Sequence, residues 1–328
     1  MEIQLTRSLK GTKLNIWKKF LERAGIEADS LISRTVLVWD DNKLIATGSR
    51  QGNILKCIAV DESRRGEDLT ATVLSELRKD AFAEGHSHLF LYTKPENKDL
   101  FTSLFFYEVA QTDKVLLMEN RRDGIKEFLS SMPAEGFDGI IGSIIMNANP
   151  FTRGHRYLIE KAAGECKQLY VFVLSEDKSL FSAEDRMEMV KRGTKDILNV
   201  TVLPTGPYLI SSATFPTYFL KERDKATNIQ CMLDIEIFVR YFAPKFSITR
   251  RYAGTEPLSP MTDMYNKALQ KNLPEKGIEF FEIDRIPEDS APISASRVRA
   301  LIDEGDIESV RKLVPETTFN YLQTHGLL

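Results

Sequence analysis

Cysteine and histidine are scarce in this sequence. Its 328 residues include three cysteines and four histidines, and the cysteines stand far apart at positions 57, 166 and 231. So sparse and odd a set forms neither a disulfide framework nor a C-x-x-C zinc motif. We therefore expect reduced thiols, no metal-binding residues and a cytoplasmic protein.

Long apolar runs and a surplus of one charge are absent as well. No stretch approaches the roughly 20 apolar residues that span a bilayer, and the N-terminal residues do not form an apolar signal segment. The net charge is −3, and neither half of the chain is basic. These absences argue against membrane and nucleic-acid partners. A local phosphate site stays compatible with them, because it needs only a few cations and backbone amides.

The length and composition predict two globular domains. Hydrophobic residues make up 42% of the chain and charged residues 28%, which is ordinary globular composition. The first part favours an α+β module with strands at 35–39, 44–49, 54–60 and 88–93 and helices at 68–84 and 97–105. A connecting helix at 124–131 then leads into a stretch with proline and glycine at 133–139. We place the two domains at 1–132 and 138–328.

The second part alternates strands with helices. Strands are expected at 140–146, 169–174, 200–203, 246–249 and 278–283, with helices at 155–163 and 182–192. The first of these strands is almost continuously apolar, as in a buried parallel sheet, and Ser182 is a suitable N-cap for the second helix. The alternation predicts an α/β fold with a doubly wound, Rossmann-like parallel sheet.

A loop suited to phosphate binding follows the strand at 140–146. It runs from Asn147 to His155, reads NANPFTRGH, and ends where a helix begins. Gly154 allows close backbone approach, and the free amides and dipole of a helix N-terminus favour a phosphate. Thr152 and His155 would add side-chain donors to phosphate oxygens. A helix-capping loop with an incidental histidine is the alternative interpretation at this point.

A second motif, ISASRVR at 293–299, opens another helix. Ser294 can cap that helix, while Ser296 and Arg299 can face an anion at its first turn. Alone, this motif is more typical of an ordinary capped helix start than of a ligand site. Two such motifs on one chain of alternating strands and helices indicate a nucleotide site at the carboxyl ends of the strands.

This pair of motifs resembles the T/HxGH and ISxSxxR signatures of the nucleotidylyltransferase superfamily, which includes phosphopantetheine adenylyltransferase. The segment FSAEDRMEMV at 181–190 is also similar to that superfamily. The resemblance implies attack on the α-phosphate of ATP with loss of pyrophosphate, and ATP and Mg²⁺ as cofactors. It implies catalytic roles for His155, Thr152 and Arg299.

Nearly the whole chain resembles the [citrate (pro-3S)-lyase] ligase family. The supporting strings are the loop and helix at 146–162, RYAGTEP at 251–257, and LKCIAVD at 55–61. The resemblance implies that ATP activates acetate as an acetyl-adenylate, and that the acetyl group then passes to the CoA-like thiol of the citrate lyase acyl carrier subunit. The implied ATP-binding residues are Asn147, Ala148, Asn149, Phe151, Gly154, His155, Gly254, Glu256, Ser294, Ser296 and Arg299.

The first part resembles a GNAT acetyltransferase domain, and its pyrophosphate loop would lie at 63–68. Ser63 and Asp68 break the usual Arg/Gln-x-x-Gly-x-Gly/Ala pattern, and Asp68 would repel a pyrophosphate. We therefore expect this domain to hold the carrier's thiol arm without using acetyl-CoA as a donor. Docking of protein alone is the other possibility for this domain. We interpret Cys57 as a buried strand residue.

Two other functions remain open from the sequence. The chain could be an adenylyltransferase acting on a phosphorylated small molecule, or a non-catalytic module that binds CoA or an acyl carrier. The sequence does not locate the acetate pocket. Arg186, Arg250 and Arg251 are candidates for its carboxylate, and surface ion pairing is the alternative for each.

Overall fold

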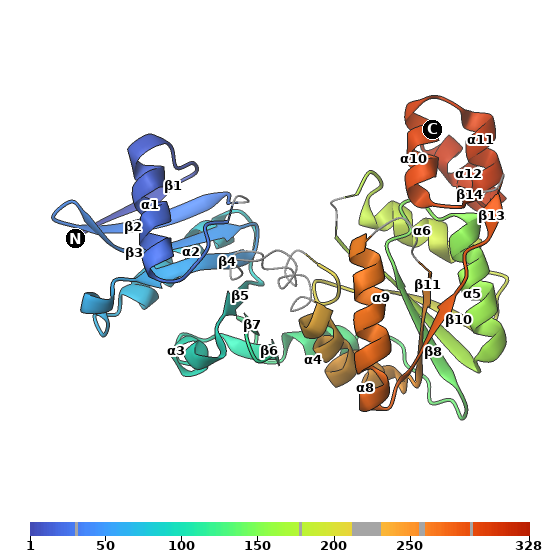
Figure 1. The fold of residues 1–328 in the computed structure, drawn as a ribbon, viewed down its shortest axis with the longest axis horizontal. Helices are drawn as coiled ribbons and strands as arrows, with labels where there is room; N and C mark the ends of the chain where they lie inside the picture. The colour runs from blue at the N-terminus through green and yellow to red at the C-terminus, as the bar shows by residue number, and fades with distance from the viewer. Residues whose placement is uncertain (30–31, 177–178, 212–230, 256–259, 289–290) are drawn as a thin grey trace. The chain divides into compact units, whose positions relative to one another are not determined.

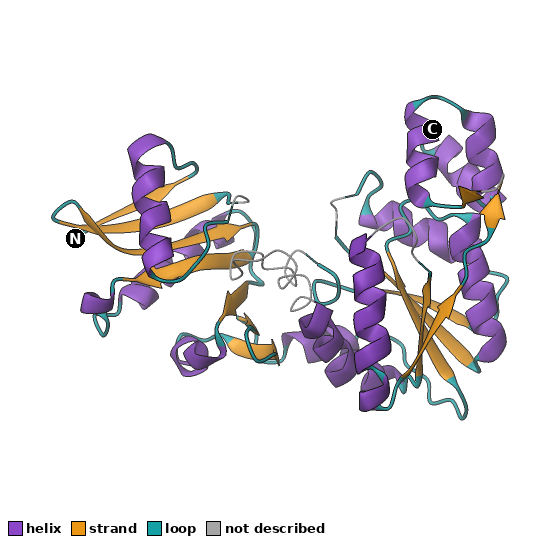
Figure 2. Cartoon of the chain, viewed as in Figure 1, coloured by secondary structure: helices purple, strands orange, loops and turns teal. Residues whose placement is uncertain are grey.

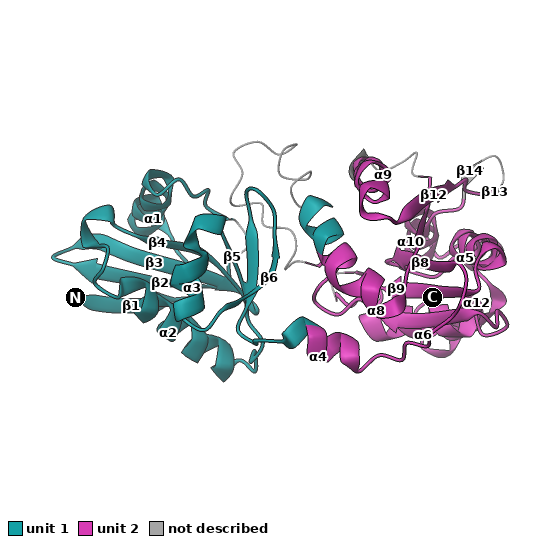
Figure 3. Ribbon diagram, turned by 90° about the horizontal axis from the view of Figure 1, so that it is seen from below, with its two compact units in different colours: residues 1–125, 213–236 teal, residues 126–212, 237–328 magenta. Residues whose placement is uncertain are grey.

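The computed structural model describes residues 1–29, 32–176, 179–211, 231–255, 260–288 and 291–328. The chain divides into two compact units, one of Met1–Ile125 with Ala213–Glu236 and one of Lys126–Ser212 with Ile237–Leu328 (Figure 3). The division falls inside the helix α4, Gly124–Ser130, which is the expected connecting helix. We keep 1–132 and 138–328 as a proposal for the domain limits.

The first unit combines one sheet with several helices (Figures 1 and 2). Its elements in chain order are β1 (Glu2–Thr6), α1 (Gly11–Arg23), β2 (Arg34–Asp40), β3 (Lys43–Gln51), β4 (Ile54–Val60), α2 (Leu69–Ala83), β5 (Phe90–Thr93), α3 (Lys98–Ser103), β6 (Tyr107–Gln111) and β7 (Leu116–Glu119). The sheet has the order β1-β2-β3-β4-β5-β7-β6. All neighbouring strands are antiparallel except β4 and β5, which are parallel and pair only at Ile54 with Phe90 and Leu55 with Leu91.

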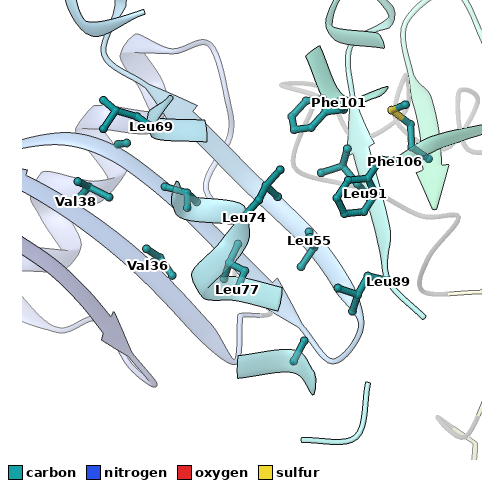
Figure 4. Packing of buried hydrophobic residues seen from close by; sticks show 14 of the residues in the cluster. Val36, Val38, Leu55, Leu69, Leu74, Leu77, Leu89, Leu91, Phe101 and Phe106 are labelled. Carbon is teal, nitrogen blue, oxygen red and sulfur yellow. The ribbon is translucent and has the colours of Figure 1, made fainter. Parts of the chain in front are cut away.

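Helix α2 supplies the core of the first unit. Its leucines at 69, 74 and 77 are buried with Val36 and Val38 of β2, and Figure 4 shows them facing one another. The spacing of these leucines places them on one face of a helix. Across the same core, Phe101 and Phe106 cover Leu91. The α+β class expected for this part is confirmed.

The second unit is built on a parallel sheet. Its elements are α4, β8 (Ile141–Met146), α5 (Arg153–Glu165), β9 (Gln168–Val173), α6 (Ala183–Gly193), β10 (Val200–Pro204), a π-helical segment (Phe238–Phe242), α8 (Ala243–Phe246), β11 (Arg250–Gly254), α9 (Pro260–Asn272), β12 (Glu279–Ile283), β13 (Pro287–Glu288), β14 (Ala291–Pro292), α10 (Ala295–Asp303), α11 (Ile307–Leu313) and α12 (Glu316–Thr324). The five-stranded sheet has the order β10-β9-β8-β11-β12, and every neighbouring pair is parallel.

Both faces of the parallel sheet are covered. On one face, Ile144 and Val171 pack in a core with Ile159 of α5 and Met189 of α6. On the other face, Phe172 meets two aromatic rings of the π-helical segment and α8, Phe242 at 5.4 Å and Phe246 at 5.3 Å between centroids. Successive strand residues point to opposite faces, so a strand that is apolar throughout needs this double cover. The predicted α/β fold with a doubly wound parallel sheet is confirmed.

One predicted strand is wrong. The run at 246–249 is not a strand: Phe246 ends α8, and Ser247 takes a left-handed conformation with φ 54°. The strand β11 starts later, at Arg250. Two consecutive arginines at its start hide the apolar pattern that marks a buried strand. Among the described helices, none is both long and apolar enough to cross a bilayer.

Candidate nucleotide site

The N-terminus of α5 is closed by a reciprocal cap between Thr152 and His155. The Thr152 hydroxyl accepts from the His155 amide at 3.3 Å, and the Thr152 amide donates to His155 Nδ1 at 3.1 Å. Each side chain thus satisfies the other residue's orphan amide, as in a capping box. The imidazole is therefore fixed at the first turn of the helix, where the dipole favours an anion.

The cap also sets the tautomer of His155. Because Nδ1 accepts from an amide, the ring proton is on Nε2. The Thr152 hydroxyl lies 2.9 Å from the same Nδ1 and donates to it. Burial, and next the charge of Arg285, lower the pKa of His155 from 6.5 to about 4. At neutral pH the side chain is an uncharged Nε2–H donor.

Phe151 fixes the other side of the imidazole. Its ring stacks on His155 with centroids 5.9 Å apart and an interplanar angle of 13°. Phe151 is fully buried and packs in the core of the second unit. Its ring also lies where Gly193 leaves room, since a Cβ at Gly193 would come within 2.4 Å of it. Phe151 therefore supports the histidine from the core of the second unit.

The second motif meets the first. Ser294 caps α10 and accepts from the Arg297 amide at 3.2 Å, as predicted. Arg299 donates from Nη1 to the carbonyl of Asn149 at 2.6 Å and from Nη2 to the Ser296 hydroxyl at 3.1 Å.

Gly154 brings the two motifs into contact along the backbone. A Cβ at Gly154 would lie 3.3 Å from the carbonyl oxygen of Ile293, which precedes α10. The glycine thus permits the close approach of the second motif to the first turn of α5. The sequence predicted close approach of a ligand at Gly154. In the structure, the backbone of Ile293 lies against one side of this glycine.

A cavity of about 330 Å³ lies at the carboxyl ends of β8, β11 and β12. Six of the predicted nucleotide-binding residues contribute to its wall, and they are Asn147, Thr152, Gly154, His155, Gly254 and Ser294. The sheet therefore collects segments that are distant in sequence at the edge where doubly wound folds bind ligands.

Five predicted residues lie beside this cavity without lining it, and they are Ala148, Asn149, Phe151, Ser296 and Arg299. Asn149 shapes the loop: its Oδ1 accepts from the Phe181 amide at 3.2 Å, and its carbonyl receives Arg299. Glu256 lies outside the described residues.

Arg186 binds the first motif through hydrogen bonds to Asn147. It is fully buried and donates to the carbonyl and Oδ1 of Asn147, at 3.1 and 2.6 Å. It also donates to the carbonyls of Leu174 and Glu176 at 2.8 and 2.6 Å. These bonds tie the loop after β8 to the loop after β9. The guanidinium is thus committed to the protein backbone, and Arg186 is not the carboxylate-binding arginine considered from the sequence.

A second cavity, of about 610 Å³, lies in the first unit where β4 and β5 diverge. Residues 57–60 of β4 form one wall, and Tyr92, Thr93 and Lys94 form another. Cys57 lines it but is fully buried, and burial raises the pKa of its thiol to about 12. The thiol therefore stays protonated at neutral pH, in agreement with its interpretation as a strand residue.

The arginines of the expected pyrophosphate loop are already paired. Arg64 binds Asp40 and Glu67, both at 2.7 Å, and Arg65 binds Glu62 at 2.9 Å. This pairing leaves little positive charge for a diphosphate at that loop.

Comparison with known proteins decides the family. Residues 141–322 match the family described as the citrate lyase ligase C-terminal domain. The chain is 41% identical to the [citrate [pro-3S]-lyase] ligase of Escherichia coli over 93% of this chain and 89% of that protein. This chain belongs to the citrate lyase ligase family. A Klebsiella pneumoniae member is 40% identical over 93% of this chain and 91% of that protein.

Beyond the citrate lyase ligase family, similarity is local. A phosphopantetheine adenylyltransferase of Clostridium botulinum is 46% identical over 25% of this chain and 47% of that protein. Similar solved structures include Escherichia coli ElaA, with 14% identity over 37% of this chain and 99% of that chain and a TM-score of 0.33. Thermotoga maritima TmcAL bound with alpha-thio ATP has 15% identity over 57% of this chain and 56% of that chain and a TM-score of 0.38. Family membership rests on the sequence relatives.

Among the polar residues of the cavity that the sequence analysis did not select in this citrate lyase ligase family member are Arg285 and Asn266. Arg285 lines it and donates to the carbonyl of Thr255 at 2.6 Å. Asn266 lines it from α9 and donates to the carbonyl of Gly254 at 3.1 Å. Arg285 follows the carboxyl end of β12, so the rule for ligands in parallel sheets would have found it. Asn266 carried no such signal.

Proposed function

We propose that this chain activates acetate with ATP and transfers the acetyl group to the CoA-like thiol of the citrate lyase acyl carrier subunit. The observation that carries the proposal is the contact of Arg299 with Asn149, which joins the two nucleotidylyltransferase motifs beside one cavity. Identity over nearly the full length to [citrate [pro-3S]-lyase] ligases supports the acceptor.

The first step forms an acetyl-adenylate. An acetate oxygen bonds to the α-phosphorus of ATP, the bond from that phosphorus to the bridging oxygen breaks, and pyrophosphate leaves with the electron pair. His155 donates from Nε2 to phosphate oxygen, and its neutral state removes any need for prior deprotonation. Thr152 acts through His155, because its hydroxyl proton is engaged by Nδ1.

The second step releases AMP. The thiolate of the carrier attacks the acetyl carbonyl carbon, a thioester forms, and AMP departs with the electrons of the broken carbon–oxygen bond. The amides at the start of α5 would hold the departing phosphate. The cavity of the first unit, with Lys94 in its wall, would hold the thiol arm.

Mg²⁺ would neutralise the charge that develops on the phosphates. Among the described residues, no group of three or more His, Cys, Asp or Glu side chains could hold a metal. That arrangement fits an ion carried mainly by phosphate oxygens, as is usual for Mg²⁺. Asp284 is the carboxylate in the cavity wall that could complete its shell.

The test combines the protein with ATP, Mg²⁺, acetate and deacetylated citrate lyase. We expect stoichiometric AMP and pyrophosphate together with restored lyase activity. In a parallel reaction with a phosphorylated small molecule added, pyrophosphate release with an adenylylated product and no AMP would instead identify an adenylyltransferase. Binding of the carrier without nucleotide turnover would identify a non-catalytic module.

A further inference from the structure

Arg251 is a buried arginine with an unused donor nitrogen. It lies on β11 and is 2% exposed. Its Nη2 donates to the hydroxyl of Tyr265 at 2.9 Å, whereas its Nη1 is buried and has no hydrogen-bond partner in the described part of the chain. Arg251 is also among the residues that line the 330 Å³ cavity.

A buried cation without a counter-charge is costly to a folded protein. Desolvation of an ion is repaid only by a well-placed partner of opposite charge. No carboxylate among the described residues forms an ion pair with Arg251. Such a group is therefore poised for an anion from outside the chain, and a carboxylate suits it best, because guanidinium and carboxylate match in shape.

Two aromatic rings hold the guanidinium in place. Its carbon lies 4.6 Å from the ring centroid of Phe238 and 5.6 Å from that of Tyr265. Cation–π contacts of this kind leave the edge of the guanidinium free for hydrogen bonds. Arg251 is thus oriented before any ligand arrives, which lowers the entropy lost on binding.

The other two candidate arginines are occupied. Arg186 is bound to backbone carbonyls on several sides. Arg250, the neighbour of Arg251 on the opposite face of β11, pairs with Glu279 at 2.5 Å and does not line the cavity. Of the three, Arg251 alone combines burial, an unpartnered nitrogen and a position in the wall shared with His155.

We propose that Arg251 binds the carboxylate of the small acid that this site activates, which is acetate if the proposed function holds. Leu158 and Leu269 line the same cavity and offer apolar contact to a short methyl group. One carboxylate oxygen is held by the guanidinium, and the other attacks the α-phosphorus as pyrophosphate leaves. Arg251 is thus a substrate-binding residue.

The test compares Arg251→Met and Arg251→Lys with the matched control Arg250→Met in the full chain. Acetate-dependent pyrophosphate release gives the KM for acetate, and equilibrium dialysis gives the Kd for ATP without acetate. We expect Arg251→Met to raise the KM for acetate by about tenfold to a hundredfold, the loss expected for a charged hydrogen bond, with the Kd for ATP unchanged. The KM for acetate of Arg251→Lys should lie between those of the parent protein and Arg251→Met. The KM of Arg250→Met should equal that of the parent protein.

A stability measurement separates a binding role from a structural one. Because Arg251 carries an unpaired buried charge, Arg251→Met should unfold in urea at the same concentration as the parent protein or a higher one. A fall in that midpoint with an unchanged KM for acetate would overturn the inference, as would a weaker Kd for ATP with an unchanged KM.

Saturation-transfer NMR with formate, acetate and propionate separates this inference from the proposed function. If the parent protein binds a carboxylate in an Arg251-dependent way but releases no pyrophosphate, the proposed function fails and the site stands. If the parent protein releases pyrophosphate with acetate and Arg251→Met binds acetate equally well, the site fails and the function stands. Binding of no carboxylate by the parent protein overturns the assignment of Arg251.

Discussion

The Nη1 of Arg299 donates to the carbonyl oxygen of Asn149 across 2.6 Å and 150 positions of sequence. This bond fixes the loop before α5 against the first turn of α10. A second bond from the same guanidinium, to Ser296, is local to α10. Arg299 therefore stabilises the conformation of both motifs, the first through Asn149 and the second through Ser296.

Replacing Arg299 by alanine should weaken the use of ATP. We expect the KM for ATP to rise by about tenfold to a hundredfold, because a charged hydrogen bond to the loop is lost together with a cation near the phosphates. Arg297→Ala should have a smaller effect, since residues 296 and 299 share one helix face and residue 297 does not. Equal damage from the two changes would mean that the helix is turned differently.

Removing the imidazole of His155 should slow adenylation. His155→Ala should lower the rate of pyrophosphate release by roughly a hundredfold, as loss of one oxyanion donor typically does. The far-ultraviolet circular dichroism spectrum should be unchanged, because Thr152 can still cap α5 through the amide of residue 155. A folded variant that works at nearly the parent rate would remove His155 from the site.

The titration of His155 gives a prediction for pH. Its pKa of about 4 in the folded chain lies below the ordinary 6.5. Between these values the unfolded chain binds a proton that the folded chain does not, so stability from this residue is complete above pH 6.5 and is lost as the pH falls toward 4. NMR of the imidazole carbons, assigned with His155→Gln, should show a midpoint near 4. A midpoint near 6.5 would contradict the buried, neutral state.

Two glycines allow a matched test of packing. Gly193→Ala would place a Cβ 2.4 Å from the buried ring of Phe151, and overpacking of this kind costs about 1–3 kcal/mol. Gly164→Ala in α5 meets nothing within 4 Å and should stabilise the helix by about 0.5–1 kcal/mol. Urea unfolding of both variants measures the difference. Equal stabilities would show that Phe151 can move aside freely.

Reversing the charge of Lys94 should separate the two half-reactions. Lys94 lines the cavity of the first unit, and Lys94→Glu should lower acetyl transfer to the carrier by about tenfold or more. Pyrophosphate release with ATP and acetate should be unchanged. Lys114→Glu, which changes the same charge outside this cavity, is the control. Normal transfer by Lys94→Glu would argue against a thiol arm in the cavity. A full-length variant is preferable to expressing 138–328 alone, because residues 231–236 cluster with the first unit.

Local signals in the sequence predicted the parts of the site that are local in the structure. Ser182 and Ser294 were identified as helix caps, and both accept the expected amide. The start of α5 was expected from the same kind of pattern, because an N-cap and the amides that it binds lie within four consecutive residues. These elements placed the two motifs at the carboxyl edge of the parallel sheet.

Long-range packing determines the surroundings of side chains that the sequence analysis could not distinguish. Nothing near Arg251 distinguishes it from Arg250, and only the fold pairs one with Glu279 and buries the other beside Phe238. In the same way, Phe151 belongs to a nucleotide-binding motif by sequence but is held against Gly193 by the fold. Burial of a side chain by distant segments has no local pattern that would predict it.

The order in which a ribosome makes this chain bears on when the chain can first consume ATP. Helix α10 carries the second motif, and its buried Val298 packs with Val310, Leu313 and Phe319 of the helices that follow it. The ribosome therefore makes all five strands of the parallel sheet before it makes the residues that hold Arg299 against Asn149. A chain whose translation stops before α10 would carry the strands of the parallel sheet without Arg299, and so without the bond that joins the two motifs.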